Sequence, residues 1–182
     1  IDPVRFIGNR SSGKQGYAIA QALSHAGAEV TLIAGPNNLA TPSDINCIPV
    51  ETAEDMLNAT TGALPAEICI CSAAVSDWTA KTPQTKKIKK DNKAPPSLDL
   101  TETTDILKTL SNHPQKRPDL VIGFAAETQD VEKNAQTKLK TKGCDWILAN
   151  HVGKDELGHE RAFGSDENQI YFLSNRETET WE

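Results

Sequence analysis

The residues with the clearest chemical potential lie near the start of the chain, where residues 9–16 read Asn-Arg-Ser-Ser-Gly-Lys-Gln-Gly ahead of an apolar, helix-periodic segment. Two hydroxyls, two glycines and a lysine before a helix can form a phosphate cradle. Glycine lets the backbone approach a ligand closely, and the free N–H groups and dipole of a first helical turn favour an anion. The segment therefore predicts a site for a nucleotide or a phosphorylated substrate.

This segment only partly matches the known nucleotide-binding motifs. Gly8 to Lys14 has the G-x-x-x-x-G-K spacing of a P-loop, but Gln15 stands where that motif needs Ser or Thr to hold Mg²⁺. The dinucleotide fingerprint G-x-G-x-x-G is absent. The alternative without a ligand is a Gly/Ser loop that merely caps a helix.

Two further sets of residues could serve phosphate chemistry. Asp77 follows a predicted strand, where a carboxylate can hold a ribose hydroxyl or a metal, and Lys87 could neutralise developing phosphate charge. Lys138 and Lys142 are spaced i, i+4 on one face of a predicted helix, with Asn134 one turn earlier. Each has an ordinary alternative, a turn residue for the aspartate and solvated surface charges for the lysines.

No set of residues indicates covalent catalysis. The four histidines have no fixed partner in the pattern, so neither a Ser–His–Asp nor a Cys–His arrangement is indicated. Paired carboxylates of the glycosidase kind are not visible either. The sequence therefore favours positioning and phosphate stabilisation, which nucleotidyl transfer and nucleotide-driven ligation require.

The composition is typical of one globular domain in a reducing compartment. The chain has 182 residues, of which 37% are hydrophobic and 24% charged, and its net charge is −6. That charge argues against non-specific nucleic-acid binding, despite a basic cluster at residues 86–93, and no segment predicts a membrane span or a signal peptide. The four cysteines have neither scaffold nor zinc spacing, which predicts small core residues of a cytoplasmic protein.

Helices alternate with strands along the chain. Helices are expected at residues 16–26, 53–59, 105–110 and 131–142, and strands at 5–7, 29–33, 47–50, 67–72, 120–125, 146–149 and 169–173. The apolar strand at 67–72 should be buried on both faces. Residues 87–90 and 98–101 alternate with period two around a Pro-rich turn, which predicts an antiparallel excursion, and residues 151–168 predict a long loop.

This alternation predicts an α/β fold, a Rossmann-like, doubly wound and mostly parallel sheet with a small antiparallel strand excursion. In such folds the ligand lies at the carboxyl ends of the strands, and the loop after Ser72 and residues 125–128 follow predicted strands. The phosphate loop has little strand before it. We therefore expect a single domain over residues 1–182 that is trimmed of its first strand and at its C-terminus.

Five motifs span nearly the whole chain: residues 2–16, residues 73–78 (Ala-Ala-Val-Ser-Asp-Trp), residues 87–90 (Lys-Ile-Lys-Lys), residues 123–128 (Gly-Phe-Ala-Ala-Glu-Thr), and Phe-Gly-Ser-Asp at 163–166 with Asn168. Their types and order resemble the phosphopantothenoylcysteine synthetase family, also called phosphopantothenate–cysteine ligase. The Lys-Ile-Lys-Lys version is similar to the bacterial, CTP-using branch. In that branch the ligase is usually the C-terminal half of a protein fused to a flavin-dependent decarboxylase.

The resemblance implies a two-step ligation in coenzyme A synthesis. The carboxylate of 4′-phosphopantothenate attacks the α-phosphate of CTP, which gives an acyl-cytidylate and pyrophosphate. The amino group of cysteine then displaces CMP and forms the amide. The resemblance also implies a homodimer and a need for Mg²⁺, whose protein ligands it leaves unknown.

Residue roles follow from the same resemblance. Lys87 would support acyl-cytidylate formation, and Asn9, with Arg5 nearby, would hold that intermediate. The positions assigned to the phosphates and the nucleoside are Ser11, Ser12, Gly13, Ala73, Asp77, Asp105, Phe124, Lys138 and Lys142. One departure is that residues 103–104 are Thr-Thr where the family has Asn-Pro.

Two other classes of function stay open. A nucleotide-binding oxidoreductase of the short-chain kind would fit the fold, but the missing G-x-G-x-x-G and the absence of a Tyr-x-x-x-Lys pair count against it. A regulatory domain that binds a nucleotide without turnover is the other alternative. Turnover, not binding, distinguishes it from the ligase.

Overall fold

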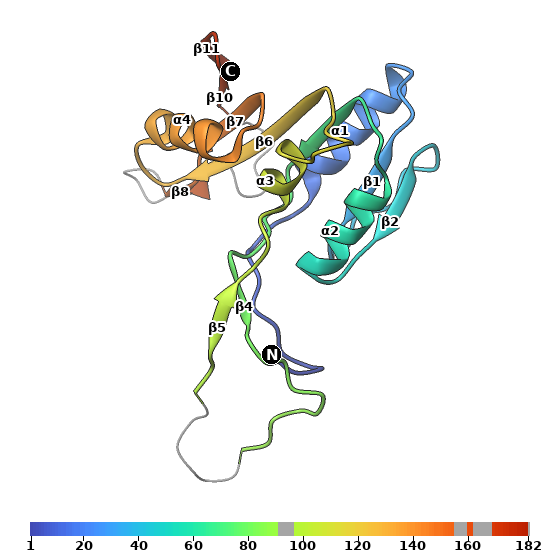
Figure 1. Ribbon diagram of the computed structural model, residues 1–182, viewed down its shortest axis with the longest axis vertical. Coiled ribbons are helices and arrows are strands. Elements are labelled where there is room, and N and C mark those ends of the chain that lie inside the picture. The colour runs from blue at the N-terminus through green and yellow to red at the C-terminus, as the bar shows by residue number, and fades with distance from the viewer. Residues whose placement is uncertain (91–96, 155–159, 162–168, 182) are drawn as a thin grey trace.

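The computed structural model describes residues 1–90, 97–154, 160–161 and 169–181. Figure 1 shows a body of strands and helices from which a long, narrow arm projects. The arm carries β4 (Trp78–Ala80) and β5 (Leu100–Glu102), which pair antiparallel. The N-terminal residues run beside this arm, where the Gln84 N–H donates to the Ile1 carbonyl at 2.9 Å.

A mixed five-stranded sheet forms the centre of the body, in the order β11-β10-β7-β6-β3. Its strands are β3 (Ile68–Cys71), β6 (Leu120–Glu127), β7 (Trp146–His151), β10 (Ile170–Ser174) and β11 (Thr178–Trp181). The β3–β6 and β6–β7 pairs are parallel, whereas β10 pairs antiparallel with both of its neighbours. The predicted α/β, Rossmann-like class with its antiparallel excursion is confirmed.

Helices flank this sheet on both sides (Figure 1). On one side α3 (Ile106–Ser111) and α4 (Val131–Lys142) lie over the sheet, and α2 (Ala53–Gly62) packs against α3 through Met56 and Leu57, while α1 (Lys14–His25) lies on the other side. The main core lies between the sheet and the pair of α3 and α4, and its largest members are Leu107, Val121, Leu139, Ile147 and Leu173. This apolar layer fixes α3 and α4 over β6 and β7.

Local sequence explains where the helices begin and end. Thr52 and Asp55 form a capping box at the start of α2, with the Asp55 N–H donating to the Thr52 hydroxyl at 3.0 Å. Asp105 caps α3 by accepting from the Lys108 N–H at 2.9 Å. Gly143 ends α4 in the left-handed region at φ 74°, which glycine adopts without steric cost. The start of α2 and both ends of α4 agree with the prediction, whereas α2 extends to Gly62 and α1 and α3 differ from their predicted bounds by one or two residues.

The sheet departs from the prediction in two respects. β1 (Thr31–Ala34) and β2 (Asn46–Pro49) pair parallel as a separate two-stranded sheet, so the doubly wound sheet is divided within the described part of the chain. β3 is an edge strand of the larger sheet and is not buried on both faces, since Ile68 is 49% exposed. β11 was not predicted, because its alternating Thr and Glu residues carry little apolar pattern.

Residues 5–7 and 87–90 do not form the predicted strands. Asp2 and Arg5 instead close a turn through reciprocal backbone hydrogen bonds of 3.1 and 3.2 Å. The antiparallel excursion exists, but β4 and β5 form it. The predicted loop at 151–168 contains the paired strands β8 (Gly153–Lys154) and β9 (Glu160–Arg161), while the motif at 163–168 lies outside the described residues.

All four cysteines are free thiols, and only Cys144 is fully buried, so the prediction of buried core cysteines holds for one of them. The sulfur atoms of Cys69 and Cys71 lie 3.9 Å apart on one face of β3, as predicted for alternate residues of a strand. None of the described helices combines the length and apolar character needed to cross a bilayer.

Gly123 of β6 generates a stability prediction, because it lets α3 lie close to the sheet. A Cβ atom at Gly123 would lie 2.5 Å from Leu107 Cδ2 and 2.8 Å from Ile147 Cδ1. We expect Gly123→Ala to lower the free energy of unfolding by about 1–3 kcal/mol, because the added methyl overpacks the core. Urea unfolding measures the difference.

Gly62→Ala is the matched control, since a Cβ at Gly62 meets nothing within 4 Å. This change should leave the free energy of unfolding the same or raise it by up to about 1 kcal/mol through helix propensity. Equal effects of the two substitutions would contradict the role assigned to Gly123.

Candidate active site

The phosphate loop predicted at residues 9–16 lies at the carboxyl end of β3. The Asn9 side-chain amide donates to the Val75 carbonyl at 3.0 Å, so this loop contacts the segment that follows β3. A Cβ at Gly16 would lie 2.9 Å from the Ser72 hydroxyl, which shows how closely the first turn of α1 approaches the strand end. The predicted juxtaposition of loop and strand end is thus present, and it depends on a glycine.

The loop places two serine hydroxyls at the N-terminal end of α1. Gly13 caps α1 in the left-handed region at φ 74° and provides no side-chain cap. The hydroxyls of Ser11 and Ser12 accept from the N–H groups of Gly13 and Lys14 at 3.3 and 3.4 Å. An anion at this end of α1 would therefore meet two hydroxyls, a lysine and the positive end of the helix dipole.

The segment after β3 connects this loop to α3. Ala73 and Asp77, both exposed, belong to that segment, and the Asp77 carbonyl accepts from the Thr103 N–H at 2.9 Å. Two residues after Thr103, Asp105 caps α3. The hydroxyl oxygen of Thr103 is buried and has no hydrogen-bond partner among the described residues.

Two lysines of α4 reach the same region. Lys138 Nζ donates to the Phe124 carbonyl at 2.6 Å, and Lys142 Nζ forms an ion pair with Asp105. Phe124 belongs to the carboxyl half of β6. The structure therefore gathers five of the predicted nucleotide residues at one edge of the sheet: Asp77, Asp105, Phe124, Lys138 and Lys142.

The charges in this group shift one another's protonation. Burial lowers the pKa of Lys138, and the neighbouring Lys142 lowers it further, while Glu127, Asp105 and Asp77 act in the opposite direction. Burial raises the pKa of Asp105, but Lys142 and the Lys108 N–H outweigh it, so the net shift is downward. A bound phosphate would reduce the repulsion between the ammonium groups of Lys138 and Lys142.

Arg5 and Lys87 lie elsewhere, on the arm. Arg5 pairs with Asp2 at 2.5 Å and donates to the Ile88 carbonyl at 2.8 Å, while Asp2 accepts from the Ile88 N–H at 3.1 Å. The Arg5 guanidinium holds the pKa of Asp2 well below its usual range. This network places Lys87, which is exposed, beside the N-terminal turn.

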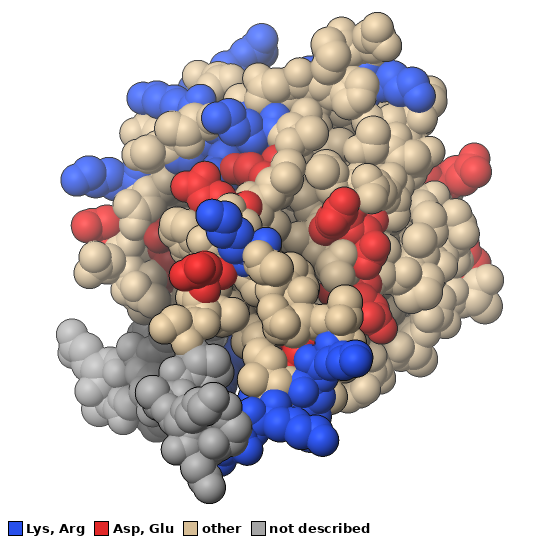
Figure 2. Space-filling view, turned by 60° about the horizontal axis from the view of Figure 1, so that its bottom comes forward, with Lys and Arg blue, Asp and Glu red and all other residues tan. Residues whose placement is uncertain are grey.

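The arm end is basic. Figure 2 brings this end of the molecule forward and shows Lys and Arg side chains gathered there, and Lys86, Lys87, Lys89 and Lys90 are all exposed. In Figure 1 the segment after β4 lies at the far end of the arm, away from α3 and α4. Within one chain, therefore, Arg5 and Lys87 are not brought to the lysines of α4.

A shallow hollow of about 460 Å³ lies at the opposite end of α4 from Lys142. Its lining residues are Asp130, Val131, Glu132, Lys133, Gln136 and Tyr171. None of the predicted site residues lines it, and its two carboxylates disfavour a polyphosphate. The candidate site is therefore the open edge between α1, α3 and α4.

The donor set at this edge suits phosphate more than a bare metal. Among the residues that the structure describes, no group of three or more His, Cys, Asp and Glu side chains converges as a metal site requires. Lysines, hydroxyls and helix N–H groups instead offer positive charge and hydrogen bonds. Such an arrangement can orient a nucleotide and stabilise charge on a phosphorus under attack.

Sequence reasoning missed Ser72 and the hydroxyl of Thr103. Ser72 closes the strand that leads into the site, and no local signal distinguishes it from an ordinary small residue. Thr103 is one of the two residues at which the chain departs from the family. The burial of its hydroxyl depends on how β5 pairs with β4. The spacing of residues along the chain predicts neither the position of Ser72 nor the burial of Thr103.

Comparison with known proteins agrees with this geometry. The family model described as DNA/pantothenate metabolism flavoprotein C-terminal domain matches residues 1–182. The coenzyme A biosynthesis bifunctional protein CoaBC of Bacillus subtilis is 43% identical over 183 residues, which cover 98% of this chain and 43% of that protein. The CoaBC protein of Haemophilus influenzae is 43% identical over 171 residues, which cover 93% of this chain and 41% of that protein.

A solved structure gives the same result. The crystal structure of the C-terminal domain of a CoaBC protein superimposes with a TM-score of 0.78 and 36% identity, covering all of this chain and 79% of that one. The chain spans less than half the length of the bifunctional relatives that it matches. The resemblance drawn from the five motifs is confirmed, and the chain belongs to the DNA/pantothenate metabolism flavoprotein C-terminal domain family.

Proposed function

We propose that this chain ligates 4′-phosphopantothenate to cysteine through an acyl-cytidylate, with CTP giving CMP and pyrophosphate. The observation that carries the proposal is the gathering of Lys138, Lys142, Asp77 and Asp105 at the carboxyl edge of the sheet, where the phosphate loop also lies. The matched relatives are named for coenzyme A biosynthesis, which supports this choice among nucleotide-driven ligations.

Each half of the reaction finds a residue suited to it. In the first step, the phosphate loop and the two lysines of α4 bind the triphosphate, and Lys87 stabilises charge on the α-phosphate as the carboxylate attacks. Asn9 and Arg5 then hold the acyl-cytidylate while the cysteine amine displaces CMP. Ala73, Asp77 and Phe124 contact the nucleoside. Mg²⁺ accompanies the triphosphate, because this ion is commonly bound through substrate phosphates and one or two carboxylates.

We propose further that the active form is a homodimer in which one chain's arm reaches the partner's body. The arm and the adjoining N-terminal segment expose large apolar side chains: Val4 is 60% exposed, Phe6 84%, Trp78 50% and Leu100 46%. Exposed apolar surface of this extent is typical of an interaction face. The separation of Arg5 and Lys87 from the lysines of α4 also requires that another arm supply them.

The same proposal places the ligase in its usual context. The relatives are called bifunctional, and we infer that the parent protein of this chain also carries a flavin-dependent decarboxylase domain. Four free thiols accord with catalysis in a reducing cytoplasm.

Mass spectrometry tests the reaction directly. The chain is mixed with 4′-phosphopantothenate, CTP and Mg²⁺, first without cysteine and then with it, and ATP replaces CTP in a parallel sample. We expect an acyl-cytidylate that accumulates and is then consumed to the cysteine amide. Nucleotide binding with no intermediate and no amide would favour a non-catalytic nucleotide-binding domain.

Lys87→Gln should abolish acyl-cytidylate formation while the circular dichroism and oligomeric state stay those of the wild type, because Lys87 is exposed on the arm.

A site shared between two chains predicts complementation between two inactive variants. A mixture of Lys87→Gln and Lys142→Met chains, each inactive alone, should regain activity, since heterodimers contain one intact site. Full activity of Lys87→Gln would refute its role, and failure of complementation after proven subunit exchange would refute the sharing.

Lys138→Met should abolish triphosphate binding without loss of stability. The fold lowers the pKa of Lys138 by burying it, so its charge disfavours folding at neutral pH. Below the folded-state pKa both states hold the proton and the penalty is complete. As pH rises towards 10.5, the pKa of Lys138 in the unfolded chain, the folded state loses its proton first. The free energy of unfolding of the wild type should therefore rise relative to that of the variant.

Urea unfolding of both proteins at pH 7 and pH 10, with calorimetry of CTP binding, measures these effects. Lys140→Met is the matched control, because Lys140 is exposed on α4 and is not among the proposed site residues, so the change should alter neither quantity. A variant that binds CTP as wild type does would remove Lys138 from the site.

A further inference from the structure

Lys142 contacts both ends of the same short helix, one through its ammonium group and the other through its backbone carbonyl. Its ammonium group pairs with Asp105, which caps the start of α3. Its carbonyl accepts from the side-chain amide of Asn112, which caps the end of α3, at 3.0 Å. The Lys142 side chain therefore runs alongside α3 from the Asn112 end to the Asp105 end.

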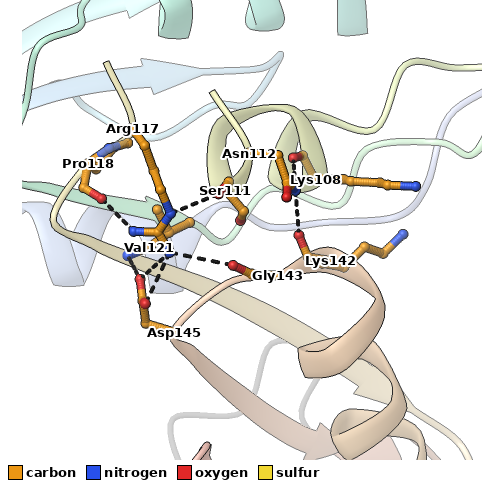
Figure 3. A network of polar contacts seen from close by, with 9 residues as sticks. All are labelled: Lys108, Ser111, Asn112, Arg117, Pro118, Val121, Lys142, Gly143 and Asp145. Atoms are coloured by element: carbon orange, nitrogen blue, oxygen red, sulfur yellow. Dashed lines mark hydrogen bonds and ion pairs between the residues drawn. The ribbon is translucent and has the colours of Figure 1, made fainter. Parts of the chain in front are cut away.

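Asn112 joins the C-terminal ends of two helices. Besides Lys142, its amide donates to the Lys108 carbonyl of α3 at 2.7 Å (Figure 3). A Cβ at Gly143 would lie 3.4 Å from both polar atoms of the Asn112 side chain, so α4 ends directly against it. A single side-chain amide thus bonds one carbonyl in the last turn of each helix, and the Lys108 carbonyl also accepts from the Asn112 N–H at 3.2 Å.

The C-terminal ends of α3 and α4 meet at Asn112 and Gly143, and we call this meeting point the corner. Arg117 attaches the corner to the sheet. Its Nε donates to the Ser111 carbonyl at 2.8 Å and its Nη2 to the Gly143 carbonyl at 3.4 Å, so its positive charge meets the negative ends of two helix dipoles. The same Nη2 bonds both carboxylate oxygens of Asp145, which accepts from the Val121 N–H at 2.7 Å (Figure 3). The corner is therefore fixed relative to the starts of β6 and β7.

These contacts lie at the amino ends of the strands, remote from the phosphate loop, and the proposed reaction assigns them no part. We propose that Asn112 is a positioning residue of the nucleotide site, which sets the end of α4 so that the Lys142 ammonium is presented beside Asp105 to the nucleotide phosphates. The inference rests on the proposed function. A phosphate contact depends on such placement, since small displacements of a binding group are costly.

The alternative is that Asn112 only stabilises the fold. Asn112 is exposed and Arg117 still bonds the Gly143 carbonyl, so removal of the Asn112 amide should leave the fold intact while it frees the Lys142 carbonyl, from which the Lys142 side chain is directed along α3. Removal of Arg117 would instead leave Asp145 and several carbonyls without their partner, and it is unsuited to a test of function. Asn112→Ala is therefore the informative substitution.

The first readout needs no nucleotide. In Asn112→Ala, carbon-13 NMR of the Asp105 carboxyl should show its pKa rising, because the Lys142 ammonium that lowers it is no longer fixed beside it. In a Lys142→Met background the same substitution should leave that pKa unchanged. An Asp105 pKa that is the same in wild type and Asn112→Ala would overturn the proposal.

The second readout is a double-mutant cycle on CTP affinity. We expect Asn112→Ala to raise the Kd for CTP by about three- to tenfold with kcat nearly unchanged, and to add nothing further in Lys142→Met. Asn58→Ala, at an exposed asparagine of α2, is the control and should leave the Kd as it is. Effects that add independently in the double variant would assign Asn112 a structural role and overturn the proposal.

The two readouts separate this inference from the proposed function. If the wild type neither binds CTP nor forms the amide, the proposed function fails, while the Asp105 titration still decides whether Asn112 positions Lys142. If the wild type binds CTP and Asn112→Ala binds it equally well, the inference fails and the proposed function stands.

Discussion

The ion pair between Lys142 and Asp105 is the constraint on which the arrangement of the site depends. It joins the last turn of α4 to the cap of α3, and Lys138 lies one turn earlier with its ammonium on the Phe124 carbonyl. Partly buried ammonium groups are costly unless carboxylates and carbonyls surround them. Both helices must therefore lie close to β6, and Gly123 makes that approach possible because no side chain separates Leu107 from the strand.

The contacts that stabilise the fold and the candidate site lie at opposite ends of the strands. At the amino ends of β6 and β7, Arg117 and Asp145 satisfy helix carbonyls and strand N–H groups, and this polar network keeps the helices in place. At the carboxyl ends, Lys138 donates to the Phe124 carbonyl, and α1 begins at Gly13 without a side-chain cap. Under the proposed function, a nucleotide phosphate would bring negative charge to these carboxyl ends. This asymmetry is what open α/β sheets provide for binding.

How much of this could be read from the sequence depended on whether the cause was local. The start of α2 at Thr52, the Asp105 cap and the end of α4 at Gly143 were predictable, because capping residues act within one turn. Residues 87–90 have strand-like alternation but bond to Asp2 and Arg5, over eighty positions away. The corner at Asn112 and Arg117 was likewise invisible, because its partners come from four separate elements. Motifs identified the candidate site residues, and tertiary packing determined which of them meet.

The separation of the arm from the body has a physical rationale of its own. A lysine that acts on a phosphate under attack must be close during the reaction, yet a third ammonium group placed permanently beside Lys138 and Lys142 would add repulsion to a cluster in which burial already lowers the pKa of one. Carrying Lys87 on an arm avoids that repulsion in the unliganded chain. Under the proposed function, the charge of the triphosphate would compensate the third cation when the partner's arm supplies it, so binding of the nucleotide and completion of the site would favour each other.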